Sequence, residues 1–486
     1  MTRAPAQGRW AVVGGGVGAL TAAGELARAG LQVTLFEATA RLGGKAATFE
    51  HGATRLDTGP TLVAMPGVVR DTFARLQAGE LLPKLTEVEL QCVYRWGNGR
   101  RLEAWRSAEQ TLASARAQFG EAEARGLEAF YAEAKRVFSA VGAPWLDAPY
   151  EGPVDLLLRA AKQGLPRARP TTLLSSLQTF AERSVRAPEL RQFLGRFATY
   201  AGASPWQASA VFSLIPFLER EEGVFHAEGG AAALANALAT AVQRLGVEVR
   251  LGQRVDWRRD GDGWLVGGER FDGVIVGADP LAHLGREREP LTLSGYVAFF
   301  EAPRRLALAH HEVAFSDDYR REFDELFAGR VPDDLTLYLC HPSATDATMS
   351  APGTSGVYAM VNAPTATDAA TLERLRTGLR RALDRHFPEL AGLAPVGERT
   401  PADLERLGAP RGSIYGFLPA GVFGSFRRPR IRGDAPGLYF AGGGTHPGGG
   451  LPMVMLSGRF AAQSALGDLL SHRRPARALL AGGAPA

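Results

Sequence analysis

The chain opens with a short apolar run that stops at three consecutive glycines. Trp10–Val13 is apolar, Gly14–Gly16 follows, and residues 17–29 place apolar side chains at helical spacing. Gly30 stands where a glycine commonly ends a helix, and Leu31–Glu37 has the pattern of a second buried strand. The pattern predicts a strand, a tight turn, a helix and a second strand, which together make one βαβ unit.

Strand patterns of the same kind return twice, far along the chain. Val247–Leu251 and Asp272–Asp279 contain apolar runs, and residues 437–459 combine a strand, a glycine-rich loop and a helix start. Strands of a parallel sheet are buried on both faces and therefore form continuous apolar runs. We predict the α/β class, with a discontinuous Rossmann-type dinucleotide-binding domain assembled from residues 1–68, 223–288 and 429–486.

Two long segments interrupt this predicted domain. Residues 69–222 have a mainly helical pattern, and residues 289–428 alternate strands with a helix. We expect them to form one inserted α+β domain that binds the substrate and associates with a membrane. Ligand sites favour the junction between domains, so a hydrophobic tunnel is expected where the inserted domain caps the cofactor.

Composition narrows the functional classes. The 486 residues are 45% apolar and 22% charged, which is typical of a folded chain with a large core. Lys and Arg number 55 against 51 Asp and Glu, and a net charge of +4 is too small to argue for a nucleic-acid partner. The two cysteines, Cys92 and Cys340, cannot form a disulfide framework, a four-thiolate metal site or a CxxC redox pair.

The sequence predicts a cytoplasmic protein with only peripheral membrane contact. The first residues lack the apolar core of a secretion signal, and no run approaches the roughly 18 apolar residues that span a bilayer. Residues 156–169 mix apolar and basic side chains as an interfacial segment does. A solvent-facing helix with a basic end is the alternative interpretation of that segment.

The first glycines carry a dinucleotide signature. Gly14, Gly16 and Ala19 fill the pattern G-x-G-x-x-G/A, which allows a tight turn, close approach of a pyrophosphate and close packing of helix against strand. The pyrophosphate would meet the helix N-terminus. Glu37 ends the second strand, where a carboxylate accepts hydrogen bonds from a ribose diol and repels a 2′-phosphate. NADP is therefore disfavoured.

Further motifs extend this site. Arg41, Gly43, Gly44 and Lys45 follow Glu37 and could bracket the phosphates, although solvated charges beside a plain turn would give the same pattern. Only one complete glycine unit exists, so we expect one dinucleotide, and the Arg-Gly-Gly-Lys extension favours FAD over NAD. The absence of a CxxC pair excludes the disulfide reductases. If FAD is bound, the expected reaction moves a hydride from carbon to the flavin.

The chain resembles the carotenoid and phytoene desaturases, a family of FAD oxidoreductases within the amine-oxidase-like flavoproteins. The resemblance covers nearly the whole chain. It implies FAD, a long acyclic carotenoid as substrate, and an external electron acceptor such as oxygen or a quinone. The motifs that carry the resemblance are Val13–Gly18, Arg41–Ala46, Asp57–Thr61, Val224–Gly230, Tyr338–Asp346 and Gly444–Gly448.

Within that family the chain is most similar to the hydroxycarotenoid 3,4-desaturases. Three segments carry this similarity: Gly412–Gly416, Gly424–Arg427 and Gly448–Gly458. It implies that a double bond is introduced near a hydroxylated end of the substrate. A phytoene or zeta-carotene desaturase, an FAD amine oxidase and a non-enzymatic isoprenoid carrier are the alternatives. The lack of any lysine after Lys162 argues against the amine oxidase, and the intact glycine motifs argue against the carrier.

The resemblance also suggests catalytic candidates. It places an acid/base pair near Asp155 and Arg159, although an ordinary surface ion pair explains the same i,i+4 spacing. His446 lies in the late glycine loop, where it could bind the flavin ring, steer a proton or act structurally. Histidines 310, 311 and 341 lack carboxylates at ligand spacing, so no metal is predicted.

The residues predicted to contact the cofactor are drawn from all three segments of the predicted dinucleotide domain. They are Gly14, Gly16, Gly18, Ala19, Glu37, Arg41, Gly43, Gly44, Lys45, Gly59, Pro60, Thr61, Val255, Gly442, Gly443, Pro452 and Met453.

Overall fold

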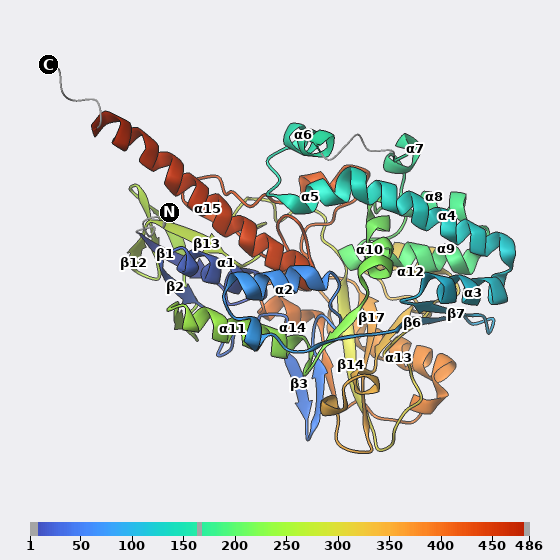
Figure 1. Cartoon of the computed structure of the whole chain (residues 1–486). Helices are drawn as coiled ribbons and strands as arrows, with labels where there is room; N and C mark the ends of the chain where they lie inside the picture. Colours follow the sequence, from blue (N-terminus) through green and yellow to red (C-terminus); the bar gives the residue numbers. More distant parts are fainter. Residues whose placement is uncertain (1–7, 163–167, 481–486) are drawn as a thin grey trace.

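A computed structural model describes residues 8–162 and 168–480 (Figure 1). Its first sheet is parallel and five-stranded, in the order β19-β13-β1-β2-β9. Two strands come from residues 1–68, two from residues 223–288 and one from residues 429–486. These strands are β1 (Arg9–Val13), β2 (Gln32–Phe36), β9 (Glu248–Arg250), β13 (Gly273–Val276) and β19 (Leu438–Phe440). The predicted βαβ unit is confirmed as β1, α1 (Val17–Arg28) and β2.

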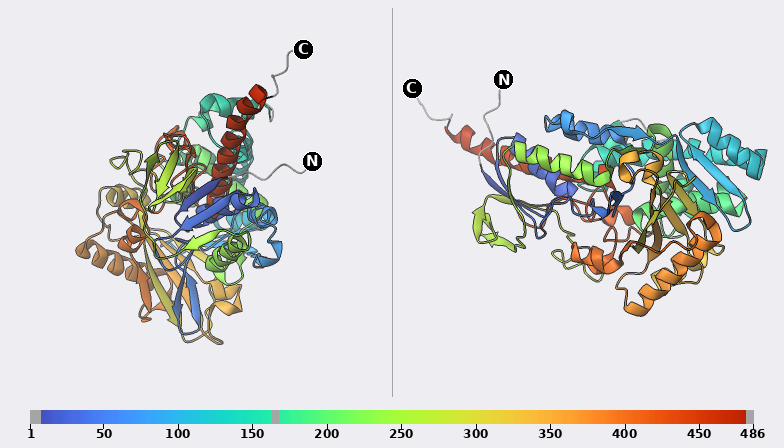
Figure 2. Two further views of the ribbon diagram at one scale, coloured as in Figure 1. Left: turned by 90° about the vertical axis from the view of Figure 1, so that its left-hand side faces the viewer. Right: turned by 90° about the horizontal axis from the view of Figure 1, so that it is seen from below.

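Both faces of the parallel sheet are covered, because successive side chains of a strand point to opposite faces. Trp10 and Val12 pack with the helices on one face, and Ala11 and Val13 pack against a small antiparallel sheet on the other. The helices are α1, α2 (Pro66–Arg75), α11 (Gly230–Arg244) and α15 (Leu451–Leu480), and the small sheet is β10 (Trp257–Asp260), β11 (Gly263–Val266) and β12 (Glu269–Phe271). Figure 2 shows α15 running along this part of the molecule toward the C-terminus.

A second, seven-stranded sheet has the order β18-β14-β17-β16-β15-β6-β7. Its pairs are antiparallel except β15 with β6. The strands are β6 (Leu90–Arg95), β7 (Arg101–Trp105), β14 (Ser294–Ala302), β15 (His311–Ala314), β16 (Leu337–Cys340), β17 (Ser355–Ala363) and β18 (Gly397–Arg399). Residues 69–222 and 289–428 thus share one sheet. The division of the chain into two domains at the predicted boundaries stays a prediction.

The prediction that residues 69–222 are helical was wrong for the part that holds β5 (Leu85–Glu87), β6 and β7. The segment 90–95 buries four consecutive side chains, so it lacks the regular alternation that marks a half-buried strand. Its other partner, β7, is near in sequence, but its parallel partner β15 begins at residue 311, where no local pattern can indicate it. The remaining short strands are β3 (Thr48–His51), β4 (Thr54–Asp57) and β8 (Phe225–Ala227).

Most of the remaining helices cover the second sheet. Figure 1 shows α4, α8, α9 and α10 above it, and α13 packs on β16 and β17. Their bounds are α3 (Ala108–Phe119), α4 (Glu121–Val137), α5 (Ala143–Asp147), α6 (Pro153–Lys162), α7 (Pro170–Leu173), α8 (Leu177–Ser184), α9 (Pro188–Gly195), α10 (Leu214–Glu222), α12 (Tyr319–Phe327), α13 (Ala369–His386) and α14 (Pro401–Arg406). Within the described ranges, no helix has both the length and the apolar character that a bilayer crossing requires.

Asp57, in the segment 1–68, is hydrogen-bonded to α11 in the segment 223–288. Its carboxylate accepts hydrogen bonds from the backbone amides of Ala231 (3.0 Å) and Ala232 (3.4 Å), at the start of α11. An acidic group stabilises a helix N-terminus by satisfying its free N–H groups. Burial nevertheless raises the pKa of Asp57 to about 7, because the charged form loses its hydration.

Candidate functional site

A cavity of about 810 Å³ lies between the parallel sheet and the seven-stranded sheet. Its wall includes Gly14 after β1, Glu37 after β2, Ala278 after β13 and Gly442 after β19. These positions all follow the carboxyl ends of parallel strands, which is where ligands bind in open α/β sheets. The cavity therefore occupies the expected place for a dinucleotide.

All but one of the residues predicted to contact a cofactor line this cavity. The exception is Arg41, whose side chain is exposed to solvent away from the wall. The prediction that Arg41 brackets a phosphate therefore gains no support from the geometry. The remaining residues come from three distant parts of the chain and meet in one place: Gly14, Gly16, Gly18, Ala19, Glu37, Gly43, Gly44, Lys45, Gly59, Pro60, Thr61, Val255, Gly442, Gly443, Pro452 and Met453.

The two early glycine loops form a cradle in contact with each other. Gly43 donates its amide to the carbonyl of Gly15 at 2.8 Å, and Gly16 and Gly43 form a parallel β-bridge. Gly16 is the N-cap of α1 and has no side-chain oxygen to accept the first N–H groups of the helix. A Cβ on Gly16 would meet no protein atom within 4 Å. The open space beside free helix amides fits a pyrophosphate.

Glu37 holds the other end of this cradle. Its Oε2 accepts a hydrogen bond of 2.6 Å from the amide of Gly15, and its Oε1 accepts bonds from the amide (2.7 Å) and hydroxyl (2.8 Å) of Thr39. A carboxylate has about four lone-pair sites, so acceptor capacity remains for a ribose diol. Thr39 also lines the cavity and was not predicted.

Three ionisable side chains, Lys45, Asp279 and Arg428, lie further along the wall, where Lys45 and Arg428 could donate hydrogen bonds to an FAD flavin ring and an Asp279 carboxylate could accept one. Lys45 donates its ammonium to the carbonyl of Ile414 at 2.5 Å, and burial lowers the pKa of Lys45 to about 8. Burial also raises the pKa of Asp279 and lowers the pKa of Arg428 to about 10. Arg428 donates to the carbonyl of Gly443 at 2.9 Å.

Of these three residues, sequence analysis found only Lys45. Asp279 is the last residue of the predicted run 272–279, at its carboxyl end, and this position is the signal that could have identified it. Arg428 lies in an irregular stretch before β19 and carries no local signature.

The three proposed catalytic residues do not line the cavity. His446 is buried, its ring lies 4.3 Å from that of Trp145, and its Nε2 donates to the carbonyl of Ala148 at 3.2 Å. Arg159 pairs with Asp155 and donates to the same carbonyl at 2.9 Å. These contacts join α5, α6 and the late glycine loop. Their catalytic role stays a prediction without geometric support.

Burial lowers the pKa of His446 to about 3, so this imidazole is neutral near pH 7. Its Nδ1 has no hydrogen-bond partner among the described residues. A neutral histidine packed among aromatic rings fits the structural role that the sequence left open.

The remaining wall of the cavity is mostly apolar and belongs to the inserted segments. Helical segments and the seven-stranded sheet both contribute, and the aromatic rings of Trp145, Tyr358 and Tyr415 face the same space. Such a wall excludes water and suits a long hydrophobic molecule. Its apolar members include Val141, Leu146, Val211, Phe212, Leu214, Ile215, Leu218, Leu293, Val297 and Met360.

His310, His311 and Cys340 lie together, with one potential ligand atom of each within 4.8 Å of the others. The Nδ1 of His310 is hydrogen-bonded to Thr345 Oγ1 at 2.6 Å, and that of His311 to Tyr338 Oη at 2.9 Å. Burial lowers the pKa of His311 to about 3 and raises the pKa of the Cys340 thiol. Burial lowers the pKa of His310 as well, so both imidazoles are neutral near pH 7, and each has one ring nitrogen hydrogen-bonded. The prediction of no metal stays a prediction.

Comparison with known proteins gives one consistent result. The family described as flavin-containing amine oxidoreductase matches residues 20–466. The hydroxyneurosporene desaturase of Cereibacter sphaeroides is 34% identical over 95% of this chain and 98% of its own length. The hydroxyneurosporene desaturase of Rubrivivax gelatinosus is 30% identical over 98% of this chain and 96% of its own length. The lycopene-forming phytoene desaturase of Pseudescherichia vulneris is 30% identical over 94% and 99%.

Solved structures agree on the fold. A putrescine oxidase has a TM-score of 0.66 at 16% identity and covers 96% of this chain and 99% of its own. The cyclohexylamine oxidase of Brevibacterium oxydans has a TM-score of 0.61 at 15% identity, with the same coverage. At such low identity these structures bear on the fold alone.

Proposed function

Since this chain belongs to the flavin-containing amine oxidoreductases and to their carotenoid desaturases, we propose that it is a hydroxycarotenoid 3,4-desaturase. In this proposal it introduces a C=C bond near the hydroxylated end of a long acyclic carotenoid. The observation that carries the proposal is the similarity, along almost the entire chain, to relatives named hydroxyneurosporene desaturase.

The protein is an FAD oxidoreductase, and FAD, when bound, would accept from carbon a hydride, which carries two electrons. We assign the pyrophosphate to the cradle at Gly16 and Gly43 and the ribose to Glu37. Lys45 and Arg428 supply hydrogen-bond donors further along the same wall. These assignments rest on the open space at Gly16 and on the donor and acceptor chemistry of the residues present.

The chain's own contribution to desaturation is orientation and exclusion of water. Removing a hydride from an allylic carbon is favourable only where the developing positive charge can spread into the polyene. The carotenoid must therefore be held in one register in the cavity. The apolar wall supplies that confinement. The adjacent carbon must also release a proton. We propose that the electrons finally pass to an external acceptor, either oxygen or a quinone.

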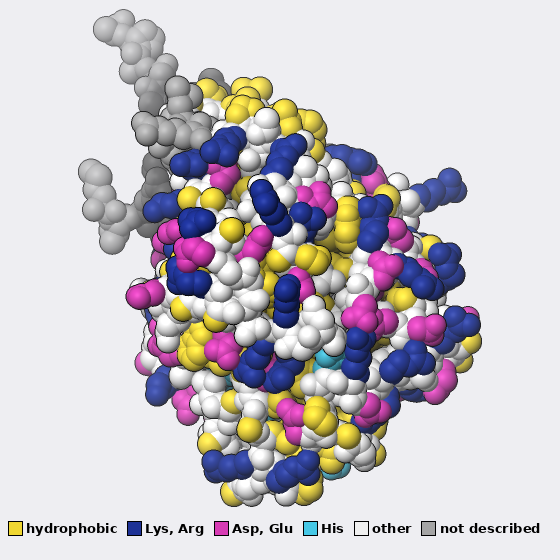
Figure 3. Space-filling view, turned by 90° about the vertical axis from the view of Figure 1, so that its right-hand side faces the viewer, with side chains coloured by type: hydrophobic (Ala, Val, Ile, Leu, Met, Phe, Trp, Pro, Cys, Tyr) yellow, Lys and Arg dark blue, Asp and Glu magenta, His cyan; other side chains and the backbone are white. Residues whose placement is uncertain are grey.

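We further propose that the protein takes its substrate from a membrane surface. On α6, the side chains of Val154, Leu157 and Leu158 are exposed by 69%, 69% and 60%. Leu174, beside α7, is 62% exposed. Hydrophobic side chains gather at the upper edge of the face in Figure 3, and α6 and α7 lie at the top of Figure 1. Residues 163–167, in the middle of the predicted interfacial segment, lie outside the described residues.

The proposal is tested by expressing the protein in cells that accumulate neurosporene, lycopene or their 1-hydroxy derivatives and separating the pigments. We expect the hydroxylated pigments to lose two hydrogens and absorb at longer wavelength. Cells that make only phytoene should show no change. Consumption of phytoene alone would make the chain a phytoene desaturase, and no change with any pigment would contradict desaturation altogether.

A further inference from the structure

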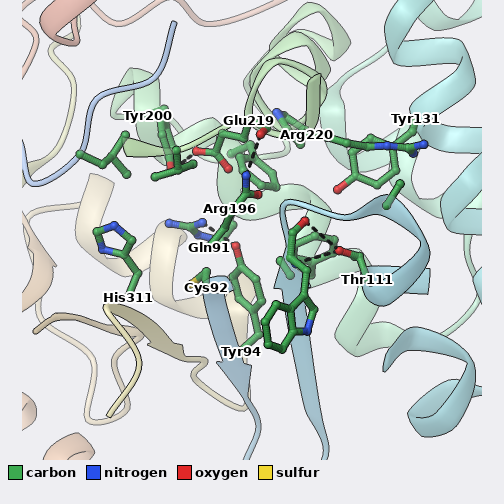
Figure 4. Close-up of a pocket in the computed structure, with 18 of the residues that line it drawn as sticks. Gln91, Cys92, Tyr94, Thr111, Tyr131, Arg196, Tyr200, Glu219, Arg220 and His311 are labelled. Atoms are coloured by element: carbon green, nitrogen blue, oxygen red, sulfur yellow. Dashed lines mark hydrogen bonds between the residues drawn. The ribbon is translucent and has the colours of Figure 1, made fainter. Parts of the chain in front are cut away.

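A small cavity of about 30 Å³, with apolar and polar side chains in its wall, adjoins the large one (Figure 4). A volume of this size holds one or two water molecules, or a single hydroxyl group, but no length of hydrocarbon chain. Four residues belong to the walls of both cavities. They are Leu62, Arg196, Tyr200 and Tyr338. A molecule lying in the large cavity could therefore place one polar end group in the small one.

Arg196 stands at this junction with unused hydrogen-bond donors. Its Nη1 donates to Tyr94 Oη at 2.9 Å, and its guanidinium lies 5.4, 5.3 and 5.3 Å from the ring centres of Tyr94, Phe197 and Tyr200. Within the described ranges, no carboxylate lies within ion-pair distance of it. A guanidinium inside a protein is normally paired, because its five donors require acceptors. The donors that remain on Arg196 are available to a ligand.

An acceptor lies close to these donors. Tyr200 Oη donates a hydrogen bond to Glu219 Oε1 at 2.6 Å, and Gln91 Nε2 donates one to the backbone carbonyl of Glu219 at 2.8 Å. Glu219 also lines the small cavity. The site thus offers donors from Arg196 and an acceptor from Glu219. A hydroxyl group both donates and accepts hydrogen bonds, whereas a carboxylate ligand would meet the acidic Glu219.

The junction is also adjacent to the predicted cofactor contacts. Tyr338 Oη is hydrogen-bonded to Thr61 Oγ1 at 2.6 Å and to His311 at 2.9 Å. Thr61 ends the segment Gly59–Thr61, which we expect to contact the cofactor. In a 1-hydroxycarotenoid the hydroxyl-bearing carbon is two bonds from C3. An anchor for that hydroxyl beside Thr61 would hold the C3–C4 bond near the same segment.

We propose that Arg196, Tyr200 and Glu219 form a hydroxyl-binding site that selects carotenoids with a terminal hydroxyl and fixes their register in the large cavity. This inference rests on the proposed function and names the residues that give it substrate selectivity. Arg196 and Glu219 bind the hydroxyl directly, and Tyr200 is a positioning residue that orients the Glu219 carboxylate.

The test compares Arg196→Met with the wild-type holoenzyme on two substrates, 1-hydroxyneurosporene and neurosporene, delivered in liposomes. Methionine keeps an apolar stem of similar length but removes every donor. The matched control is Arg380→Met, since Arg380 also stacks on an aromatic ring, that of Phe300 at 5.3 Å, but borders neither cavity.

We expect the wild type to prefer the hydroxylated substrate by at least about tenfold in kcat/KM, since a site built to bind a hydroxyl discriminates strongly against its absence. Arg196→Met should reduce kcat/KM for 1-hydroxyneurosporene by at least about tenfold more than it reduces kcat/KM for neurosporene, which has no hydroxyl group. The position of the new double bond should also become mixed. Arg380→Met should match the wild type on both substrates.

Three results would overturn the proposal. If the wild type prefers the hydroxylated substrate and Arg196→Met keeps the same preference, the anchor lies elsewhere. If the wild type consumes both substrates equally, the site does not select hydroxyls, while the desaturase function stands. If the wild type consumes neither, the proposed function itself fails, and the hydroxyl site fails with it.

Two further variants keep the test decisive if Arg196→Met does not fold. Arg196→Lys retains a charge but loses the fork of donors, and Tyr200→Phe removes only the hydroxyl that holds Glu219. Each should lower the preference for the hydroxylated substrate, and an unchanged preference in both would contradict the site. As an independent binding readout, hexadecanol should inhibit more strongly than palmitate. Stronger inhibition by palmitate would indicate an anion site instead.

Discussion

The amide of Gly15 donates a hydrogen bond of 2.6 Å to the Glu37 carboxylate, which links the first glycine loop to the end of the second strand. The contact joins residues 22 positions apart. It fixes the acceptor group beside the α1 N-terminus, so the proposed ribose and pyrophosphate contacts of FAD become parts of one cradle.

Glu37→Arg should therefore abolish FAD retention. The substitution removes the acceptor for the ribose and places a cation where the Gly15 and Thr39 amides already point. We expect the purified variant to hold less than about a tenth of the wild-type flavin, measured by visible absorption against protein concentration. Glu50→Arg is the control, since Glu50 is 66% exposed on β3. An equally yellow Glu37→Arg protein would contradict the ribose assignment.

Gly16→Ala should weaken FAD binding without destabilising the apoprotein. The added methyl group meets no protein atom within 4 Å, and the φ of −69° at Gly16 suits alanine. The methyl group instead fills space assigned to the pyrophosphate, so affinity should fall at least about tenfold. Equilibrium dialysis of FAD and thermal unfolding of the apoprotein measure the two effects.

The control for that experiment is Gly67→Ala. Gly67 is an exposed glycine of α2 whose added Cβ would also meet nothing within 4 Å. This change should leave FAD affinity unchanged and should not destabilise the helix. If both variants bind FAD as the wild type does, the cradle is not the pyrophosphate site.

Asp57→Asn should change how stability depends on pH. The folded-state pKa of Asp57 is raised to about 7 from 3.8. At pH values between these two, the Asp57 carboxyl is protonated in the native state and ionised in the unfolded state. This group therefore lowers the free energy of unfolding as pH rises from about 4 to 7, by up to about 1.4 kcal/mol per pH unit. The asparagine variant lacks this dependence.

Urea unfolding at several pH values measures that difference. Relative to the wild type, Asp57→Asn should gain stability steadily between about pH 4 and pH 7. Asp262→Asn, at a carboxylate that is 93% exposed, should show no such trend. A constant difference between Asp57→Asn and the wild type across this range would show that Asp57 is not protonated in the folded state.

Membrane attachment should depend on the exposed leucines of α6. The double change Leu157→Asp and Leu158→Asp places charges on side chains that are 69% and 60% exposed, so it should reduce co-sedimentation with liposomes several-fold while leaving FAD content intact. Leu251→Asp, at a leucine that is 44% exposed next to β9, is the control. Equal sedimentation of both variants and the wild type would exclude α6 as the attachment site.

The cofactor half of the site could be predicted because its signals are local. Gly14, Gly16 and Glu37 lie within one βαβ unit, where sequence spacing determines spatial spacing, and the late glycine loop repeats the same strand-loop-helix order. Arg41 belongs to the same motif but lies on its solvent side, and spacing alone cannot distinguish the two sides of a turn.

The substrate half could not be predicted, because its residues converge only in the folded chain. Arg196 follows α9, Glu219 lies within α10 and Tyr338 lies on β16, so more than 140 positions separate the first from the last. Arg196 and Glu219 belong to no motif, and the motif that begins at Tyr338 does not show which residues it meets. Strand β6 was missed for a related reason, since its parallel partner β15 lies about 220 residues further along.

The most direct test of the account is anaerobic mixing of the purified yellow protein with 1-hydroxyneurosporene in liposomes, followed by absorption spectroscopy. We predict that the flavin band bleaches while the polyene band moves to longer wavelength, in equal molar amounts, and that putrescine causes no bleaching. A colourless protein, a flavin that the carotenoid leaves oxidised, or bleaching by the amine alone would contradict the account.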